Sequence, residues 1–421
     1  MPLDYSQHPC FNAESRHRTG RIHLPVAPKC NVQCNFCNRK YDCANEGRPG
    51  VTSAVLTPVQ ALRYLDQALK FNPALRVVGI AGPGDPFAQP DKTLEMLRLV
   101  REKYPEMLLC VATNGLNVAP YVDELAQLQV SHVTLTVNAV SPEISADVYA
   151  WVRDGRTILR GIPAAQLLLE RQIEAIKVLK KKSIIVKVNT IIIPNVNDFH
   201  IPEVAEEMRA LDVDIMNCIP LYSVPGTPFE SITPPSPEET GRLRTEVSVY
   251  VPQMNHCTRC RADAVGLLGQ EPTVEIRELL RNCAEGIPEP TKDRPYVAVA
   301  SMEGLLVNQH LGEARSLWIF DLTMGYPTLI DQRKAPEPGG GDARWKDLAK
   351  ILKDCHTIFV SGVGRNPRET LEDSGMRVIE MTGLISDGVG SLMRTGTIPN
   401  YMRKPLRSCG SECQGGGTGC S

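Results

Sequence analysis

Three cysteines, Cys30, Cys34 and Cys37, form a C-x3-C-x2-C run directly after the apolar segment Ile22 to Ala27. Iron–sulfur clusters are normally closed by four protein ligands, so three thiolates leave one iron of a 4Fe-4S cubane open to a small molecule. The spacing therefore predicts a compact loop that closes around a catalytic cluster at the end of a strand. A zinc site or three unrelated thiols are the alternatives, but zinc sites favour paired C-x2-C motifs.

Phe36 lies between the last two cysteines, and this aromatic strengthens a resemblance to the radical SAM superfamily. The resemblance implies that S-adenosylmethionine (SAM) chelates the open iron and is split by one electron to a radical. The cofactor would supply the reactive chemistry, and the protein would hold the cofactor in position. Phe36 is accordingly a candidate cofactor-binding residue.

The chain from residue 21 to about 250 alternates short apolar runs with amphipathic stretches, which is typical of β/α units with a parallel sheet. We expect an α/β fold, a partial (β/α)6 barrel, with its active site at the carboxyl ends of the strands. The expected strands are Arg21–Ala27, Arg76–Gly82, Met107–Asn114, His132–Val140, Ser183–Ile193 and Asp214–Leu221, and the expected helices include Pro58–Phe71, Lys92–Lys103 and Ala164–Lys181.

Small and polar residues stand at these strand ends. Gly82 and Gly84 let the backbone approach a ligand, and Asp85 can hold the amine of SAM; a tight strand-to-helix turn would use the same residues. The candidates for binding the ribose or carboxylate of SAM are Thr113, Asn114 and Asn138. Simple capping of the strand ends is the alternative.

Length and composition limit the remaining classes. A chain of 421 residues predicts two or three domains. Its net charge of −2 gives no electrostatic argument for nucleic acid or an anionic membrane as a partner. We expect a cytoplasmic protein, because no apolar run or signal pattern suits a membrane or export. Fourteen cysteines in a reducing compartment then suggest metal ligands.

A composition shift divides the chain near its proline-rich segment 286–295. We expect a catalytic domain over residues 1–285, a linker over 286–295, and a small α/β domain over 296–400. The Gly-rich stretch 401–421 cannot bury a core and is expected to be a flexible tail. Its cysteines are either transient iron ligands or bystanders: Cys409, Cys413 and Cys420.

Further candidate metal ligands stand outside the first motif. They are His8, Cys10, Cys43, Cys110, Cys257 and Cys260. Side chains in a strand alternate faces, so Cys110 shares the face of Asn114 and points into the barrel if Asn114 does. A lone strand cysteine is usually a small buried hydrophobe. Together, however, the five thiols and one imidazole suffice for two further clusters with three protein ligands each.

The motifs His8-Pro9-Cys10-Phe11, Ala27 to Gly50, Gly82 to Pro86 and Cys257-Thr258-Arg259-Cys260 resemble the NifB family of nitrogenase cofactor biosynthesis proteins. The resemblance implies that two 4Fe-4S clusters are fused, with a SAM-derived carbide and an added sulfur, into the 8Fe-9S-C precursor of the nitrogenase cofactor. It places Cys30, Cys34 and Cys37 on the SAM cluster, His8, Cys43 and Cys110 on one auxiliary cluster, and Cys10, Cys257 and Cys260 on the other. It also makes Glu46 and Cys110 candidate catalytic residues, although Glu46 is alternatively a solvated loop carboxylate.

Residues 296–400 resemble NifX-like domains that bind the cofactor or its precursor, which implies a ribonuclease H-like fold. The matching element is Val307 to Gly312, and His310 is its candidate cluster-binding residue. An ordinary surface histidine is the alternative. The implied partners are iron–sulfur cluster donors, downstream cofactor carriers or scaffolds, and a reductant protein such as a ferredoxin.

Two other functions fit parts of the pattern. A radical SAM maturase acting on a peptide would usually carry a longer cysteine-rich extension than one C-x2-C pair. A non-catalytic iron–sulfur carrier would not need the SAM-binding segment from Gly82 to Asp85. Iron quantification separates a three-cluster enzyme from a simple radical SAM enzyme.

Overall fold

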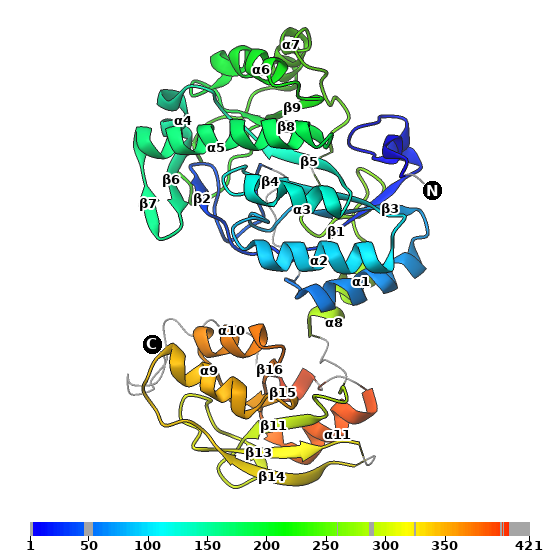
Figure 1. Ribbon diagram of the computed structural model, residues 1–421, viewed down its shortest axis with the longest axis vertical. Coiled ribbons are helices and arrows are strands. Elements are labelled where there is room, and N and C mark those ends of the chain that lie inside the picture. The colour runs from blue at the N-terminus through cyan, green and yellow to red at the C-terminus, as the bar shows by residue number, and fades with distance from the viewer. Residues whose placement is uncertain are drawn as a thin grey trace. The chain divides into compact units, whose positions relative to one another are not determined.

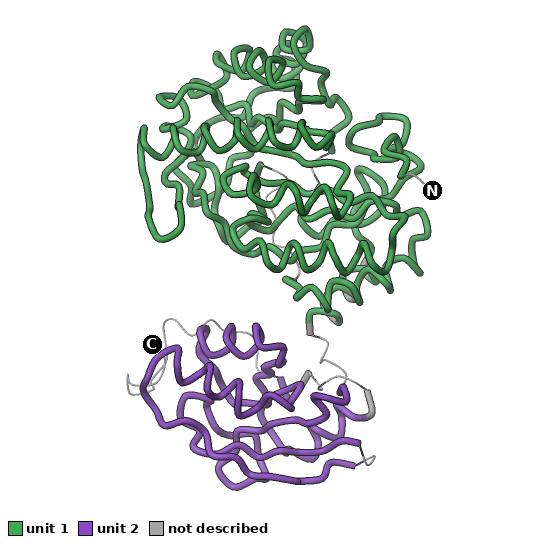
Figure 2. The backbone as a smooth tube through the Cα atoms, viewed as in Figure 1, with its two compact units in different colours: residues 1–284 green, residues 285–421 purple. Residues whose placement is uncertain are grey.

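The computed structural model describes residues 3–45, 54–258, 260–285, 290–323, 326–395, 398 and 400–403. The chain forms two compact units, Met1–Ala284 and Glu285–Ser421 (Figure 2). Glu46 and the three tail cysteines, Cys409, Cys413 and Cys420, lie outside the described residues.

The first unit is built on a seven-stranded sheet in the order β10-β1-β3-β4-β5-β8-β9 (Figure 1). Its strands are β1 (Gly20–His23), β3 (Leu75–Ile80), β4 (Leu108–Thr113), β5 (Val130–Thr136), β8 (Ile185–Ile192), β9 (Ile215–Pro220) and β10 (Val265–Gly266). All neighbours are parallel except β1 and β10. The six parallel strands fall at the six predicted segments, and the predicted partial barrel is confirmed.

The first strand is shorter than predicted. It ends at His23, and Leu24 and Val26 continue as buried coil with 0% and 1% exposure. Pro25 interrupts the run, because proline has no backbone N–H for a ladder. Leu24 N still donates to Gly79 O, and Ala27 forms an isolated bridge with Pro83. Burial beneath the neighbouring segments, rather than a continuous strand ladder, therefore explains the apolar character of residues 24–27.

Helices follow the strands in chain order around the sheet (Figure 1). They are α1 (Pro58–Phe71), α2 (Pro90–Lys103), α3 (Val122–Gln127), α4 (Pro142–Val148), α5 (Gly161–Lys181), α6 (Ile201–Ala210), α7 (Pro237–Val247) and α8 (Val274–Glu285), with short 3-10 turns at Tyr5–Gln7, Ser15–His17, Ala119–Tyr121 and Asp198–His200. A capping box between Thr57 and Gln60 begins α1. Its residues Ala61, Leu65 and Ala68 recur at helical spacing and are 0% exposed, so they seal that helix against the core.

A small second sheet holds the cysteine loop in place. Strand β2 (Val32–Cys34) pairs antiparallel with β6 (Tyr149–Asp154), which pairs with β7 (Thr157–Leu159). Because β2 lies inside the cysteine motif, the loop is tied by backbone bonds to a segment more than one hundred residues away. The sequence pattern did not predict this sheet.

The second unit contains a five-stranded sheet in the order β14-β13-β11-β15-β16. Its strands are β11 (Tyr296–Ala300), β13 (Ser316–Asp321), β14 (Thr328–Lys334), β15 (Cys355–Val360) and β16 (Arg377–Glu380); a two-stranded sheet joins β12 (Leu306–Val307) and β17 (Gly383–Leu384), and the helices are α9 (Asp342–Ile351), α10 (Arg365–Asp373), α11 (Ile385–Thr395) and the 3-10 turn Asn400–Met402. The predicted small α/β domain is confirmed. The sequence pattern predicts strands at Tyr296–Ser301, Leu317–Leu322, Thr357–Ser361 and Arg377–Met381. It misses β14, a largely exposed edge strand whose polar residues lack the apolar alternation of a half-buried strand.

No helix among the described residues is long and apolar enough to span a membrane.

Candidate functional site

The three cysteines of the first motif lie on a loop braced by its own side chains. The Gln33 amide Nε2 donates to the carbonyl oxygens of Cys34 and Cys37 at 3.0 and 2.6 Å. Two other amides face the sulfurs: Asn114 Nδ2 lies 3.7 Å from Cys30 Sγ and Asn45 Nδ2 lies 3.6 Å from Cys34 Sγ. The loop therefore presents thiols supported by N–H donors, which suits thiolates bound to iron.

Burial controls the protonation of these thiols. It raises the pKa of Cys30 to about 12, with the nearby Asp85 adding to the effect, and it raises the pKa of Cys34 and Cys37. Arg39 opposes the shift at Cys37. Thiols in such a site stay neutral until a metal supplies positive charge and removes their protons. The donor set thus fits a three-ligand 4Fe-4S cluster.

Phe36 is 1% exposed and packs in the apolar cluster that contains Cys34 and Cys37. Its side chain therefore fixes the inner side of the loop. A contact between Phe36 and a cofactor stays a prediction.

The glycine-rich turn after β3 supports the backbone that leads into Cys30. Gly84 N donates to Ala27 O at 2.6 Å and Asp85 N donates to Lys29 O at 2.7 Å. A Cβ atom placed on Gly84 would lie 2.1 Å from Lys29 O. Only glycine permits this approach, so the turn and the cysteine loop are fitted to each other.

The Asp85 carboxylate is 4% exposed and is surrounded by internal donors. It accepts hydrogen bonds from Phe87 N at 2.8 Å, Thr113 Oγ1 at 2.9 Å and Asn114 N at 2.6 Å. Burial raises its pKa and these donors oppose the rise. Asp85 and Thr113 thus join the ends of β3 and β4, and binding of the SAM amine by Asp85 stays a prediction.

The two candidate asparagines have different surroundings. Asn114 is partly buried, and its Nδ2 donates to Asn31 Oδ1 at 2.7 Å as well as facing Cys30. Asn138 is 0% exposed; it donates to Tyr149 Oη at 3.1 Å and accepts from Ile191 N at 2.8 Å. Asn114 is therefore adjacent to the cluster loop, whereas Asn138 serves internal hydrogen bonds.

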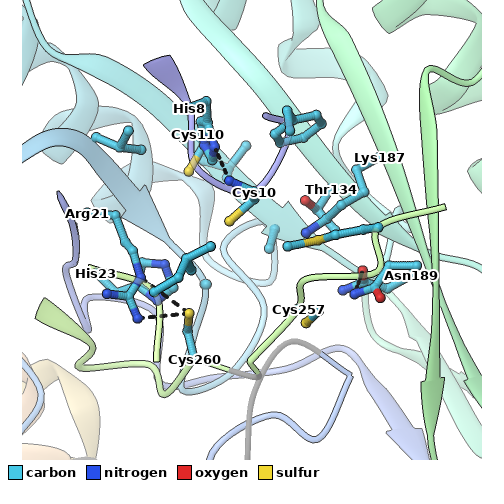
Figure 3. A pocket seen from close by; sticks show the side chains of 18 of the residues that line it. His8, Cys10, Arg21, His23, Cys110, Thr134, Lys187, Asn189, Cys257 and Cys260 are labelled. Atoms are coloured by element: carbon cyan, nitrogen blue, oxygen red, sulfur yellow. Dashed lines mark hydrogen bonds between the residues drawn. The ribbon is translucent and has the colours of Figure 1, made fainter. Parts of the chain in front are cut away.

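A cavity inside the barrel gathers most of the other candidate ligands (Figure 3). It encloses about 60 Å³ that the centre of a water-sized sphere can occupy, and it is partly open to solvent. Its wall comes from β1, β3, β4, β5, β8 and β9, from the N-terminal segment, and from the loop that precedes β10. The candidate ligands that line it are His8, Cys10, Cys110, Cys257 and Cys260.

Cys10, Cys257 and Cys260 form one side of this cavity. Burial raises the pKa of Cys10 to about 11, and the thiols of Cys260 and Cys257 are close enough to add to the effect. Arg21 donates from Nε and Nη2 to Cys260 Sγ at 3.3 and 3.0 Å. The structure thus brings together residues nearly 250 positions apart, as the resemblance implied for one auxiliary cluster.

A second imidazole, His23, lies beside Cys110. His23, Gly79 and Cys110 form one row across β1, β3 and β4. The point above Gly79 where a Cβ would stand is 3.2 Å from His23 Nε2 and 3.1 Å from Cys110 Sγ. His23 Nδ1 lies 2.9 Å from Arg261 O, which assigns the proton to Nδ1 and leaves Nε2 as the acceptor.

His8 lies on the N-terminal segment in the same cavity. Its Nδ1 accepts from Cys10 N at 3.2 Å, and its Nε2 is buried without a hydrogen-bond partner among the described residues. Burial lowers the pKa of His23 to about 4 and that of His8 well below the ordinary value. Both rings are therefore neutral, the form that binds metals. The sequence favoured His8, with His17 and His23 as its nearest rivals, but it did not reveal the row that places His23 next to Cys110.

Cys43 does not line the cavity and lies by the cysteine loop, where it raises the pKa of Cys34. The loop and the cavity are nevertheless linked. Asn189, on the cavity wall, donates to Asn45 O at 3.1 Å, and Asn45 donates to Cys34 Sγ. Within the described residues, no three His, Cys, Asp or Glu side chains converge on a single metal ion.

In the second unit, His310 forms an isolated parallel β-bridge with Gly362. Its Nδ1 accepts from Gly312 N at 3.1 Å, and its Nε2 is buried without a hydrogen-bond partner among the described residues. The ring packs against Gly362, where a Cβ would lie 2.8 Å from His310 Cδ2. The contacts with Gly312 and Gly362 therefore hold the imidazole in place, and Nε2 is the ring nitrogen that makes no hydrogen bond to the described residues.

Comparisons with known proteins agree with both units. Residues 24–208 match the Radical SAM superfamily and residues 294–394 match the family described as Dinitrogenase iron-molybdenum cofactor. The chain is 51% identical over 423 residues to FeMo cofactor biosynthesis protein NifB of Chlorobaculum tepidum, covering 100% of each, and 37% identical over 403 residues to the protein of the same name from Klebsiella pneumoniae, covering 88% of this chain and 86% of that one. Among solved structures it is similar to Streptococcus suis SuiB bound to S-adenosylmethionine, with 17% identity, a TM-score of 0.41, and coverage of 57% and 52% of the two chains.

Proposed function

The chain belongs to the NifB family of FeMo cofactor biosynthesis proteins within the radical SAM superfamily, and from this premise we propose that it fuses two 4Fe-4S clusters into the 8Fe-9S-C precursor of the nitrogenase cofactor. One SAM would provide the carbon that becomes the carbide, a second would provide the radical, and a further sulfur is added. In this reading the protein is a lyase or transferase of the radical SAM type.

The observation that carries the proposal is the hydrogen-bonded link between the cysteine loop and the interior cavity. Asn189 on the cavity wall bonds to Asn45, which bonds to Cys34 of the loop. A radical generated at the loop would therefore arise next to the chamber that collects the other candidate ligands. A simple carrier would not need a radical-generating loop beside its cluster ligands, and a peptide-modifying enzyme would usually carry a longer cysteine-rich extension.

Cys30, Cys34 and Cys37 are the residues that would hold the SAM cluster, which when bound supplies reductive cleavage of SAM. The amides of Asn45 and Asn114 would stabilise the thiolate sulfurs that they face. The turn at Gly84 and Asp85 positions the backbone before Cys30. These residues therefore place the reactive group and exclude water from the inner side of the loop.

The two clusters to be fused are substrates held by the cavity. Cys10, Cys257 and Cys260 would bind one of them. Cys110 would bind the other with one imidazole, and the row of His23, Gly79 and Cys110 supports His23 beside His8 as that imidazole. Cys43, which lies by the cysteine loop and does not line the cavity, stays the predicted third ligand of this cluster. Holding two reactants in a productive geometry can lower a barrier by roughly 7 to 11 kcal/mol.

Pulsed EPR on matched variants identifies the nitrogen ligand. Strong nitrogen coupling in the reduced protein should disappear in either His8→Ala or His23→Ala and remain in the other. Coupling that persists in both variants would contradict an imidazole from this cavity.

Iron and sulfide analysis of anaerobically purified protein tests the cluster count. We expect about twelve irons per chain, corresponding to three cubanes. Cys34→Ala and Cys260→Ala should each lose about one third of the iron, and SAM cleavage should be lost in Cys34→Ala. The control is Cys283→Ala, which changes a buried thiol on α8 outside both sites. This variant should keep the full iron content. Only four irons in the parent protein, or 5′-deoxyadenosine release by Cys34→Ala, would contradict the proposal.

The second unit would bind the finished cluster, with His310 Nε2 as a ligand. All candidate ligands for the three clusters precede residue 261, so a chain ending at residue 290 should keep SAM cleavage and fusion near the full-length level. His310→Ala in the full chain should retain less eight-iron product without slowing fusion. Loss of fusion on truncation would contradict this division of labour.

The proposed partners follow from the same role. Cluster donors would load the cavity, a reductant such as a ferredoxin would supply electrons, and a cofactor carrier would receive the product. A pull-down of the loaded protein with each purified partner measures these contacts.

A further inference from the structure

The charges that line the interior cavity are all of one sign. Arg21 and Lys187 line it, and no aspartate or glutamate does among the described residues. Lys187 is 8% exposed and Arg21 is 2% exposed. A cavity with a cationic lining attracts anions, so this lining suits an anionic occupant.

Arg21 is committed to one end of the cavity. Its guanidinium donates to Cys260 Sγ and to the carbonyl oxygens of Gly266 and Leu267. It therefore holds the backbone within and directly after β10 while it faces the sulfur of one candidate ligand.

Lys187 is one of the residues that line the cavity. It stands on β8 opposite Thr134 of β5, and its Nζ lies 5.7 Å from the centroid of the Phe11 ring. Figure 3 shows its side chain directed into the space that Cys10 also faces. Cys10 of one ligand set and His8 and Cys110 of the other line the same cavity, so the ammonium shares one chamber with both sets.

Two thiolate-ligated clusters placed side by side repel each other, because each carries negative charge in a site of low dielectric constant. A fixed cation in the same cavity reduces that repulsion and also favours their reduced, more negative states. Lysine offers a compact ammonium for this purpose, without the planar fork of arginine.

We propose that Lys187 is a positioning residue that neutralises the two substrate clusters in the cavity and allows them to lie next to each other. This role depends on the proposed function of the cavity. It adds a residue outside the ligand sets, one that touches no cluster iron and acts through charge.

The test is an EPR-monitored redox titration of the auxiliary clusters in anaerobically loaded, full-length protein. Lys187→Met keeps the apolar length of the side chain and removes the charge, and Lys187→Arg keeps the charge. We expect Lys187→Met to disfavour reduction at least tenfold, a decrease in potential of about 59 mV for one electron, and Lys187→Arg to restore the parent potential. Lys177→Met, an exposed position on α5, is the control for net charge and should leave the potential unchanged.

The outcomes separate the role of Lys187 from the function of the cavity. Parent protein with about twelve irons and an unchanged potential in Lys187→Met overturns the role of Lys187 alone. An equal decrease in Lys187→Met and Lys187→Arg overturns it as well, since shape and not charge would then matter. Parent protein with only four irons overturns both proposals. If Lys187→Met does not fold, as judged by circular dichroism, Lys187→Gln takes its place with the same expectations.

Discussion

Replacement of Gly84 by alanine should disrupt the cysteine loop without touching a thiol. The new Cβ would lie 2.1 Å from Lys29 O, 2.6 Å from Lys29 C and 3.0 Å from Ala27 O, all of them backbone atoms. Backbone cannot rotate away as a flexible side chain does. The turn must therefore move away from the segment that leads into Cys30.

The expected loss of stability follows from the contacts that this movement breaks. The bonds from Gly84 N to Ala27 O and from Asp85 N to Lys29 O are worth about 1 kcal/mol each. Overpacking adds about 1 to 3 kcal/mol. We expect Gly84→Ala to lower the free energy of unfolding by about 3 to 5 kcal/mol and to reduce the iron bound by the cysteine loop.

Urea unfolding followed by circular dichroism measures the stability, and iron analysis after anaerobic reconstitution measures the cluster. Gly241→Ala is the matched control: Gly241 lies within α7 with no atom near its virtual Cβ, so alanine should stabilise the helix by about 0.5 to 1 kcal/mol. Parent-like stability and full iron content in Gly84→Ala would refute the argument.

Two further predictions concern buried titratable groups. Asp85→Asn places amide hydrogens where three donors already point, so it should cost about 1 to 3 kcal/mol and weaken SAM cleavage; parent-like urea unfolding would contradict the internal role of this carboxylate. His356 is 1% exposed, and burial lowers its pKa to about 4. Because burial favours the neutral imidazole, protonation of His356 destabilises the folded state. The free energy of unfolding should therefore decrease as the pH falls from 6.5 to about 4, by at most about 3 kcal/mol. In a Trp151→Phe background, where the remaining tryptophans belong to the second unit, urea unfolding by fluorescence should show this loss, and His356→Leu should remove it; the same acid sensitivity in that variant would assign the effect to other groups.

Periodicity predicted the barrel because its strands are buried on both faces and its helices carry regular apolar stripes. The expected helix Pro58–Phe71 coincides with α1, whose proline and capping box mark its start in the sequence. The sequence pattern missed β14 because most of its residues are polar. It extended the first strand beyond His23 because the residues that follow are apolar. An apolar pattern in the sequence therefore predicts a strand correctly only where the buried residues also form the backbone hydrogen bonds of a sheet.

The site was less accessible to sequence reasoning than the fold. The cysteine spacing identified the loop, because its ligands are neighbours in the chain. The row of His23, Gly79 and Cys110 depends on strand register, which no local pattern specifies. Likewise, Asn114 and Asn138 occupy equivalent places in the sequence, and only packing separates the one that faces Cys30 from the one that is buried. Nothing in the sequence distinguishes Lys187 from an ordinary lysine on a strand.

Isotope transfer from SAM tests the central claim, fusion of two clusters around a SAM-derived carbon, most directly. Anaerobic protein with all clusters loaded is incubated with SAM labelled in its methyl carbon and with dithionite, and label in the protein-bound cluster is counted after exhaustive removal of free SAM. The account predicts one labelled carbon for about eight irons of product, with none retained in Cys34→Ala. Release of all label in small molecules, while 5′-deoxyadenosine still forms, would contradict it.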